Sequence, residues 1–209
     1  MKHYRRSYYN VFSRFYDRFV ALHASDAQNV ARRYLADLVP VSNGERVLDL
    51  CTGTGSLLPY LSRKVGRNGA VVGVDFSRGM LAVNLRKTKG LENIHLGEAD
   101  AGALPFIAGR FDAVTCSHAF YELKGESQER ALREIQRILK PGKVFLMMEH
   151  DVPKNSLVRA LFYIRMLSMG AGRAHSILDH EKTMLESCFG WVDRVTSPSG
   201  RSKILVCSK

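Results

Sequence analysis

The feature that most constrains the fold of this chain is an apolar run that ends in a glycine-rich turn. Residues 47–50 are apolar around Asp49, and Gly53 and Gly55 follow in the turn. A helix-like pattern begins directly afterwards at Ser56. A strand, a tight turn and a helix N-terminus in this order are typical of the place where an open α/β sheet binds a nucleotide-like ligand.

A second apolar run, at 70–75, also ends in a carboxylate. This residue, Asp75, stands 20 positions after Gly55. A carboxylate at this separation can accept hydrogen bonds from both hydroxyls of a ribose. The two runs together predict a cofactor that contains adenosine.

Strand and helix patterns alternate along the chain. The expected strands are 46–50, 70–75, 93–97, 112–117 and 143–149, and the expected helices are 27–39, 56–65, 78–89 and 126–140. This alternation predicts a parallel sheet with helices on both faces, doubly wound by right-handed crossovers. After residue 180, a short helix at 179–188 precedes strands at 191–197 and 203–207, which predict an antiparallel hairpin. The expected fold is therefore a Rossmann-like α/β fold of about seven strands, most of them parallel.

The length of 209 residues suits a single domain. Within it we expect an N-terminal helical arm or lid at 1–40, a cofactor-binding core at 44–150, a substrate-side segment at 151–190 and a C-terminal hairpin at 191–209. Neither a membrane-spanning run nor the apolar core of a signal peptide is evident, and the four cysteines form no CxxC pair. These features indicate a cytoplasmic protein with reduced thiols.

The formal net charge of +11 has several explanations. Nucleic acid, anionic lipid or an acidic substrate can each attract a basic protein, and a solvated basic surface needs no partner at all. Because no nucleic-acid motif accompanies the charge, we expect no nucleic-acid partner. Peripheral contact with the inner face of a membrane stays open, and the sequence does not indicate an oligomeric state.

Polar and small residues follow the later strands as well. Asp100 and Ala101 come after the third strand, and Ser117 ends the fourth. In a parallel sheet these positions share one edge with Asp75, where ligands bind. Asp100 can accept a hydrogen bond from the adenine amine. A P-loop is excluded because no GK[ST] follows the glycines, and a dinucleotide site is disfavoured because Leu58 replaces the third glycine.

In these motifs the chain resembles the class I S-adenosylmethionine-dependent methyltransferases. The matching segments are Val47–Gly55, Gly73–Asp75 with Ser77–Leu81, Glu98–Ala101 with Leu104–Phe106, Phe111–Val114, and Leu139–Gly142. The resemblance implies S-adenosylmethionine as the cofactor. It further implies a methionine pocket shaped by Asp49, Gly53 and Gly55, and cofactor contacts from Tyr16, Thr54, Asp75, Phe76, Asp100, Ala101 and Ser117.

Within that family the chain is most similar to the ubiquinone/menaquinone-biosynthesis C-methyltransferases. The similarity lies in Phe15-Tyr16-Asp17 of the arm and in Met148–Leu157. Three features depart from the pattern: Cys51 replaces a glycine found in many class I members, Ser117–Leu123 differs, and 170–190 is shortened. The last two leave the acceptor open among a demethylated quinone, a phospholipid head group that is N-methylated, and a small soluble molecule. A regulatory protein that binds the cofactor without turnover is the non-enzymatic alternative.

Methyl transfer is an in-line displacement for which the cofactor supplies the reactivity. Carbon methylation of a hydroquinone-like ring benefits from a base that deprotonates the acceptor hydroxyl. His118, after the fourth strand, is the candidate base. Other candidates for the acceptor pocket are Tyr121, Glu122, His150 and Asp151. We expect no metal site, because the His and Cys residues lack metal-ligand spacing.

Two further segments allow more than one interpretation. Cys51 and Cys116 are either small packing residues at strand ends or thiols that act on the substrate. The apolar segment 156–169 is too short to span a bilayer. It can form a lid over an apolar acceptor, lie on anionic lipid, or pack on the sheet.

Overall fold

The computed structural model describes residues 8–10, 13, 16, 30–123, 125–152, 155–168 and 181–209. Short helical pieces of the N-terminal arm precede the core, but Phe15 and Asp17 of the arm, and 169–180 of the substrate-side segment, lie outside the described residues. The helices are α2 (Val30–Leu38), α3 (Leu58–Val65), α4 (Arg78–Lys87), η1 (Phe120–Glu122), α5 (Glu126–Ile138) and α6 (Ser156–Ser168). The strands are β1 (Arg46–Leu50), β2 (Ala70–Asp75), β3 (Ile94–Glu98), β4 (Phe111–Ser117), β5 (Leu139–His150), β6 (Trp191–Thr196) and β7 (Ser202–Ser208).

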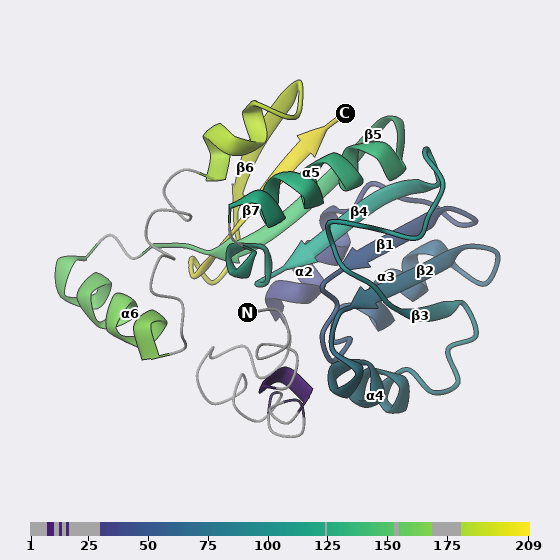
Figure 1. Cartoon of the computed structure of the whole chain (residues 1–209), viewed down its shortest axis with the longest axis horizontal. Helices are drawn as coiled ribbons and strands as arrows, with labels where there is room; N and C mark the ends of the chain where they lie inside the picture. Colours follow the sequence, from purple (N-terminus) through teal and green to yellow (C-terminus); the bar gives the residue numbers. More distant parts are fainter. Residues whose placement is uncertain are drawn as a thin grey trace.

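The seven strands form one sheet in the order β3-β2-β1-β4-β5-β7-β6 (Figure 1). The first five are parallel, whereas β7 runs antiparallel to both β5 and β6. This arrangement confirms the doubly wound, Rossmann-like fold and its C-terminal hairpin. Chain order reverses between β1 and β4, which is the switch point where ligands bind in such sheets.

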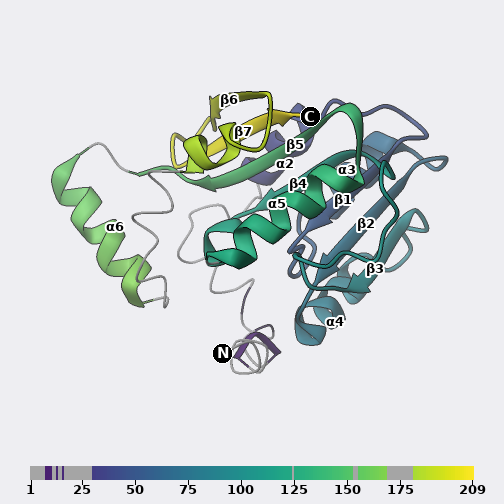
Figure 2. The same ribbon diagram turned by 45° about the horizontal axis from the view of Figure 1, so that its top comes forward.

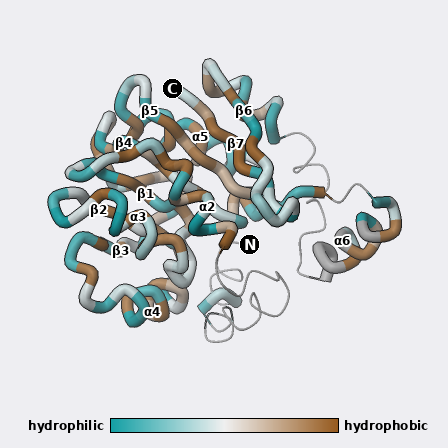
Figure 3. Tube along the Cα trace, turned by 180° about the vertical axis from the view of Figure 1, so that it is seen from behind, coloured by the Kyte–Doolittle hydropathy of each residue, from teal (hydrophilic) through white to brown (hydrophobic). Residues whose placement is uncertain are grey.

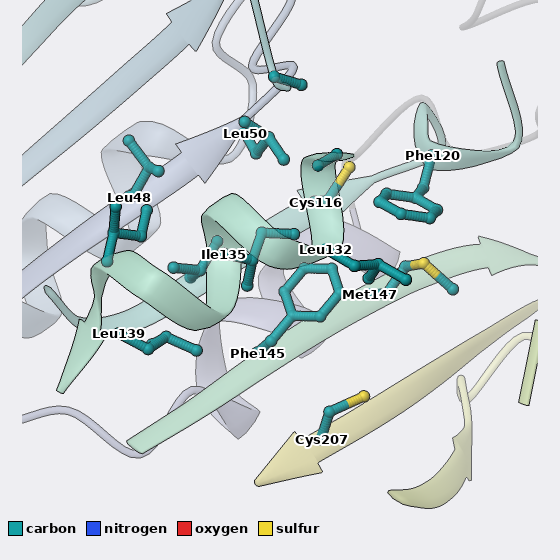
Figure 4. Close-up of a cluster of buried hydrophobic side chains, with 14 of the residues drawn as sticks. Leu48, Leu50, Cys116, Phe120, Leu132, Ile135, Leu139, Phe145, Met147 and Cys207 are labelled. Carbon is teal, nitrogen blue, oxygen red and sulfur yellow. The ribbon is translucent and has the colours of Figure 1, made fainter. Parts of the chain in front are cut away.

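Helices pack on both faces of the sheet and divide the core in two. On one face α5 places a stripe of Ala131, Leu132, Ile135 and Ile138 against Phe145 and Met147 of β5 (Figures 2 and 4). On the other face α2 and α3 pack against apolar residues of the central strands. The apolar residues concentrate in these central strands, as Figure 3 shows. The carboxyl ends of the parallel strands are therefore held by a rigid core.

Local signals in the sequence located most of these elements. β1 and β2 have the expected bounds, and Ser77 caps α4 by accepting a hydrogen bond from the Met80 amide at 3.3 Å. The expected start of α3 at Ser56 was wrong by two residues, because the backbone turns of the glycine loop continue to Leu57.

The boundary between α5 and β5 also differs from the expectation. The helix ends at Ile138, two residues early, and the strand begins at Leu139, which pairs with Phe111. Pro141 disfavours helical backbone at the residue before it. The strand pairing then jumps from Phe111 to Ala113, where Val144 is the partner.

Candidate cofactor site

The glycine loop after β1 has a backbone that few residue types adopt. Cys51, Gly53 and Gly55 have φ of 54°, 55° and 77°. A Cβ on Gly55 would lie 2.0 Å from Oδ1 of the Asn84 side chain, whereas a Cβ on Gly53 would meet no atom of the described residues within 4 Å. Gly55 is thus required by packing against α4, while no described residue packs against Gly53 in this way.

The side chain of Asp49, in β1, connects this loop to the neighbouring strand β4 by hydrogen bonds. It is buried and accepts hydrogen bonds from the hydroxyls of Thr52 at 2.6 Å and Thr115 at 2.8 Å. Burial raises its pKa to about 6, although the two hydroxyls and the nearby Arg32 guanidinium oppose that rise. Arg32 is itself buried on α2, and the sequence analysis did not single it out.

Asp75, at the end of β2, joins the glycine loop to the start of α4. One carboxylate oxygen accepts the Gly53 amide at 2.9 Å, and the other accepts the Ser77 amide at 2.9 Å. Burial raises its pKa to about 6, and the charge of Glu122 adds to this effect. Each oxygen retains a further lone pair, so the carboxylate can still accept hydrogen bonds from a ligand.

The residues next to Asp75 and after β3 are more open. Phe76 is 36% exposed, and Asp100 is exposed while its Oδ1 accepts the Gly102 amide at 3.0 Å. Ala101, beside it, is buried. An aromatic face and a carboxylate thus stand at the same edge of the sheet as Asp75.

The loop after β4 brings together the side chains expected near the acceptor. His118 has φ of 51°, and its amide donates to the Met148 carbonyl at 2.7 Å. Its ring centroid lies 4.5 Å from that of His150, which follows Glu149 at the end of β5. The Tyr121 ring lies 5.9 Å from His150. Ser117 is half-buried immediately before this cluster.

The N-terminal arm contacts both sides of the site. The Tyr9 hydroxyl donates to the Glu122 carboxylate, with oxygen–oxygen distances of 2.6 and 2.5 Å, and its ring meets Phe76 edge-on. Asn10 Oδ1 accepts from the Ser77 hydroxyl at 2.9 Å. Tyr16 is half-buried and interacts electrostatically with Tyr9. The family resemblance pointed only to Tyr16 of the arm, and no sequence signal marked Tyr9 or Asn10.

A lysine that the sequence analysis missed lies against the glycine loop. The Lys87 ammonium group, at the end of α4, donates to the hydroxyls of Thr54 and Ser56, each at 3.1 Å. The Thr54 side chain is buried. The position of Lys87 in the last turn of a helix gave no sign that its side chain reaches the glycine loop.

Two tests for other kinds of site gave no candidate in the part of the chain that the structure describes. There, no group of three or more His, Cys, Asp or Glu side chains is placed to hold a metal ion. None of the described helices is both long and apolar enough to cross a membrane. Cys116 is buried in the core beside Phe120 (Figure 4), which supports its interpretation as a packing residue.

Comparison with known proteins gives the class of this chain. Residues 47–142 match a family model described as "Methyltransferase domain". Demethylmenaquinone methyltransferase of Staphylococcus epidermidis is 33% identical over 184 residues, which cover 87% of this chain and 76% of the relative. The Staphylococcus aureus protein of the same name is 34% identical over 150 residues, 72% of this chain and 61% of the relative.

Solved structures agree with the fold. An S-adenosylmethionine-dependent methyltransferase of Aquifex aeolicus superposes with a TM-score of 0.65 at 20% identity, covering 88% of this chain and 92% of the other. A chain from the Haloferax volcanii complex between the Trm112 methyltransferase activator and a methyltransferase superposes with a TM-score of 0.72 at 18% identity, covering 97% and 96%. The chain therefore belongs to the class I S-adenosylmethionine-dependent methyltransferases, within the group similar to the menaquinone-biosynthesis enzymes.

The residues at the sheet edge fit S-adenosylmethionine. No described residue lies within 4 Å of a Cβ built on Gly53, and Asp75, Phe76 and Asp100 provide a carboxylate, an aromatic face and a second carboxylate that suit an adenosine group. When bound, the cofactor supplies an electrophilic methyl group.

Proposed function

We propose that this enzyme methylates a ring carbon of a demethylated quinol, a lipophilic acceptor of the demethylmenaquinone kind. The observation that carries the proposal is the 33% identity to a demethylmenaquinone methyltransferase over 76% of that relative. The aromatic and imidazole side chains of Tyr121, His118 and His150, gathered beyond β4 and β5, suit a flat aromatic ring.

On this proposal the cofactor contacts come from four strand ends. Asp75 accepts the ribose hydroxyls, Phe76 lies against the adenine ring, and the Asp100 carboxylate accepts the adenine amine. Ala101 and Ser117 border the same pocket. Asp49, Gly53, Thr54 and Gly55 shape the loop around the methionine part, and Tyr16 belongs to the arm that closes the site.

His118 has the role of the base. It accepts the proton of the acceptor hydroxyl, which raises electron density at the neighbouring ring carbon. That carbon would receive the methyl group that bound S-adenosylmethionine supplies, and the electron pair of the broken carbon–sulfur bond would stay on sulfur. Loss of the ring proton restores aromaticity, and His118 returns its proton to the oxygen, so one proton is released per methyl group.

The acceptor's lipophilic nature gives α6 a role at a membrane. Leu157, Leu161 and Ile164 are 70%, 59% and 63% exposed and recur at the spacing of one helix face. Figures 1 and 2 both show α6 apart from the sheet. The helix sequence includes two arginines and no acidic residue, and the whole chain has a net charge of +11. An apolar face on a basic protein favours peripheral contact with an anionic membrane.

The acceptor is tested with purified enzyme, methyl-labelled S-adenosylmethionine and vesicles that contain reduced demethylmenaquinone. The expected product is a quinone heavier by one CH₂ unit that carries the label. The variant His118→Ala should lower kcat by about a hundredfold, in line with the loss of a general base. Label recovered only in a phospholipid head group or a water-soluble product would refute the quinol acceptor.

Membrane contact is tested separately by co-sedimentation with vesicles of phosphatidylglycerol or phosphatidylcholine. The wild type should sediment with the anionic vesicles, and Leu161→Glu should abolish this. Leu85→Glu and Ile107→Glu are matched controls, because these residues are 65% and 71% exposed elsewhere on the surface. Equal sedimentation of Leu161→Glu and the wild type would contradict the role of α6.

A further inference from the structure

Three charged side chains are buried together on the α5 face of the sheet, outside the candidate cofactor site. Glu149 of β5, Lys203 of β7 and Glu181 of the helical segment 181–186 are each at most 5% exposed. Lys203 lies opposite Glu149 in the strand register and forms an ion pair with Glu181. Buried charges are costly unless they are paired, so such a cluster calls for a specific reason.

The cluster holds two carboxylates and one ammonium group. Burial, followed by repulsion from Glu181 and Glu122, raises the pKa of Glu149 well above its usual range. Burial also raises the pKa of Glu181 to about 7, although Lys203 opposes the change. The charged or titratable groups that act on this pair from neighbouring elements are Cys116, Glu122, Asp151, Arg194 and Lys203. Burial and the neighbouring Glu181 therefore both favour the neutral form of Glu149.

Glu149 is attached to the loop that carries the acceptor-side residues. Its Oε1 accepts the backbone amides of Phe120 at 2.9 Å and Tyr121 at 3.3 Å. Among the described residues, its buried Oε2 has no hydrogen-bond partner. The Phe120 ring inserts into the core near Met147, as Figure 4 shows, so the backbone of η1 is held by both the ring and the carboxyl group.

The adjacent residue on β5 holds the start of the same loop. The Met148 carbonyl accepts the His118 amide at 2.7 Å, while His118 has its unusual positive φ. Two successive residues of β5 therefore fix the backbone on either side of the His118 ring. A substitution at Glu149 should therefore shift the positions of the His118 and Tyr121 side chains through the loop backbone, although Glu149 itself is not placed to contact the acceptor.

We propose that Glu149 is a positioning residue for methyl transfer: held beside the Lys203–Glu181 pair, it fixes the loop 117–123 through the Phe120 and Tyr121 amides. The effect on turnover rests on the proposed function, whereas the effect on the loop does not. Glutamine should be able to replace Glu149, since an amide keeps the acceptor oxygen for the two backbone amides and carries no charge into the buried cluster.

The test compares Glu149→Gln with Glu149→Ala in two measurements. The first is hydrogen exchange at the Phe120 and Tyr121 amides, which needs no acceptor. Exchange should quicken at least tenfold in the alanine variant and stay within threefold of wild type in the glutamine variant. Equal protection in both variants, or loss of protection in the glutamine variant, would overturn the proposal.

The second measurement is turnover with the quinol. Glu149→Ala should lower kcat at least tenfold with less than a twofold change in cofactor Kd, and Glu149→Gln should restore kcat. Asp112→Ala is the matched control: this buried carboxylate accepts the Arg46 amide at 3.0 Å at the opposite edge of the sheet, so kcat should be unchanged. If Asp112→Ala lowered kcat as much as Glu149→Ala does, the effect of Glu149→Ala would be a general structural one and the positioning role would be rejected. Absence of turnover in the wild type would reject the acceptor, and the exchange data would still decide the role of Glu149.

Discussion

Cofactor affinity should depend on pH through the carboxyl group of Asp75. Its pKa in the cofactor-free protein is raised to about 6, chiefly by burial. In the proposed cofactor site the charged form is the acceptor for both ribose hydroxyls, and a proton on one oxygen would remove acceptor capacity. Binding should therefore be fully developed at pH 8 and weaken as pH falls through 6.

The size of the effect follows from the fraction of ionised Asp75. With a pKa of about 6, roughly one tenth of the Asp75 carboxyl groups are ionised at pH 5. If the ionised form accounts for nearly all of the binding, the apparent Kd should rise about tenfold from pH 8 to pH 5. This rise corresponds to a loss of about 1.4 kcal/mol of binding free energy. Calorimetric titration with S-adenosylmethionine at pH 8 and pH 5 measures this change in Kd directly. A Kd that is unchanged over this range would refute the assignment of the ribose to Asp75.

The variant Asp75→Asn separates this carboxyl group from Asp49, whose pKa is also about 6. The substitution should weaken binding at pH 8 by about 1.5–3 kcal/mol, because a charge-assisted acceptor is lost. It should also flatten the pH profile. If the variant retains the full tenfold change, another group causes the pH dependence.

The same carboxyl groups should affect stability with a definite sign. The pKa of each is higher in the folded protein than the usual 3.8, so the folded state holds its protons more tightly. Their contribution to the free energy of unfolding is largest below about pH 4 and is lost as pH rises through 6. Urea unfolding of the wild type and Asp75→Asn from pH 4.5 to 7.5 should show a smaller decline in the variant.

Two further changes test the loop and the arm. Gly55→Ala should reduce the free energy of unfolding by about 2–3 kcal/mol, because φ is positive there and the Asn84 side chain occupies the space of a Cβ. Gly53→Ala should reduce it by only about 1 kcal/mol but should weaken cofactor binding. Equal losses of stability in urea unfolding would argue against this difference in packing. Tyr9→Phe removes the hydrogen bonds to Glu122 and should raise the cofactor Kd by about fivefold, or about 1 kcal/mol. An unchanged Kd in calorimetric titration would exclude the arm from the cofactor site.

Local patterns were sufficient to predict the fold. The apolar runs of β1 and β2 are bounded by turn residues, and the glycine loop between β1 and α3 restricts the chain to an α/β switch point. The same local signals placed Asp75, Asp100 and Ser117 on one edge of the sheet, because the carboxyl ends of parallel strands meet there. The family resemblance then supplied the identity of the cofactor.

Contacts between distant segments could not be predicted in this way. Tyr9 and Glu122 are 113 positions apart, and no periodic pattern relates an arm to the loop after β4. Arg32 and Lys87 have no local sequence signal that marks them out, yet Arg32 is buried near Asp49 and Lys87 donates a hydrogen bond to Thr54. Part of the basic character of the chain is therefore engaged within the fold.

Glu149 shows why burial decides the meaning of a charged residue. In the sequence it ends an apolar strand, as Asp75 does in β2, and no local pattern shows which groups surround it. The antiparallel return of β7 instead places Lys203 opposite it, and the segment 181–186 adds Glu181 above both. An acid that is solvated in isolation becomes a buried acceptor for two amides once the hairpin pairs with β5. The C-terminal hairpin, remote from the glycine loop in sequence, thus pairs with the strand whose Glu149 accepts the amides of the acceptor-side loop.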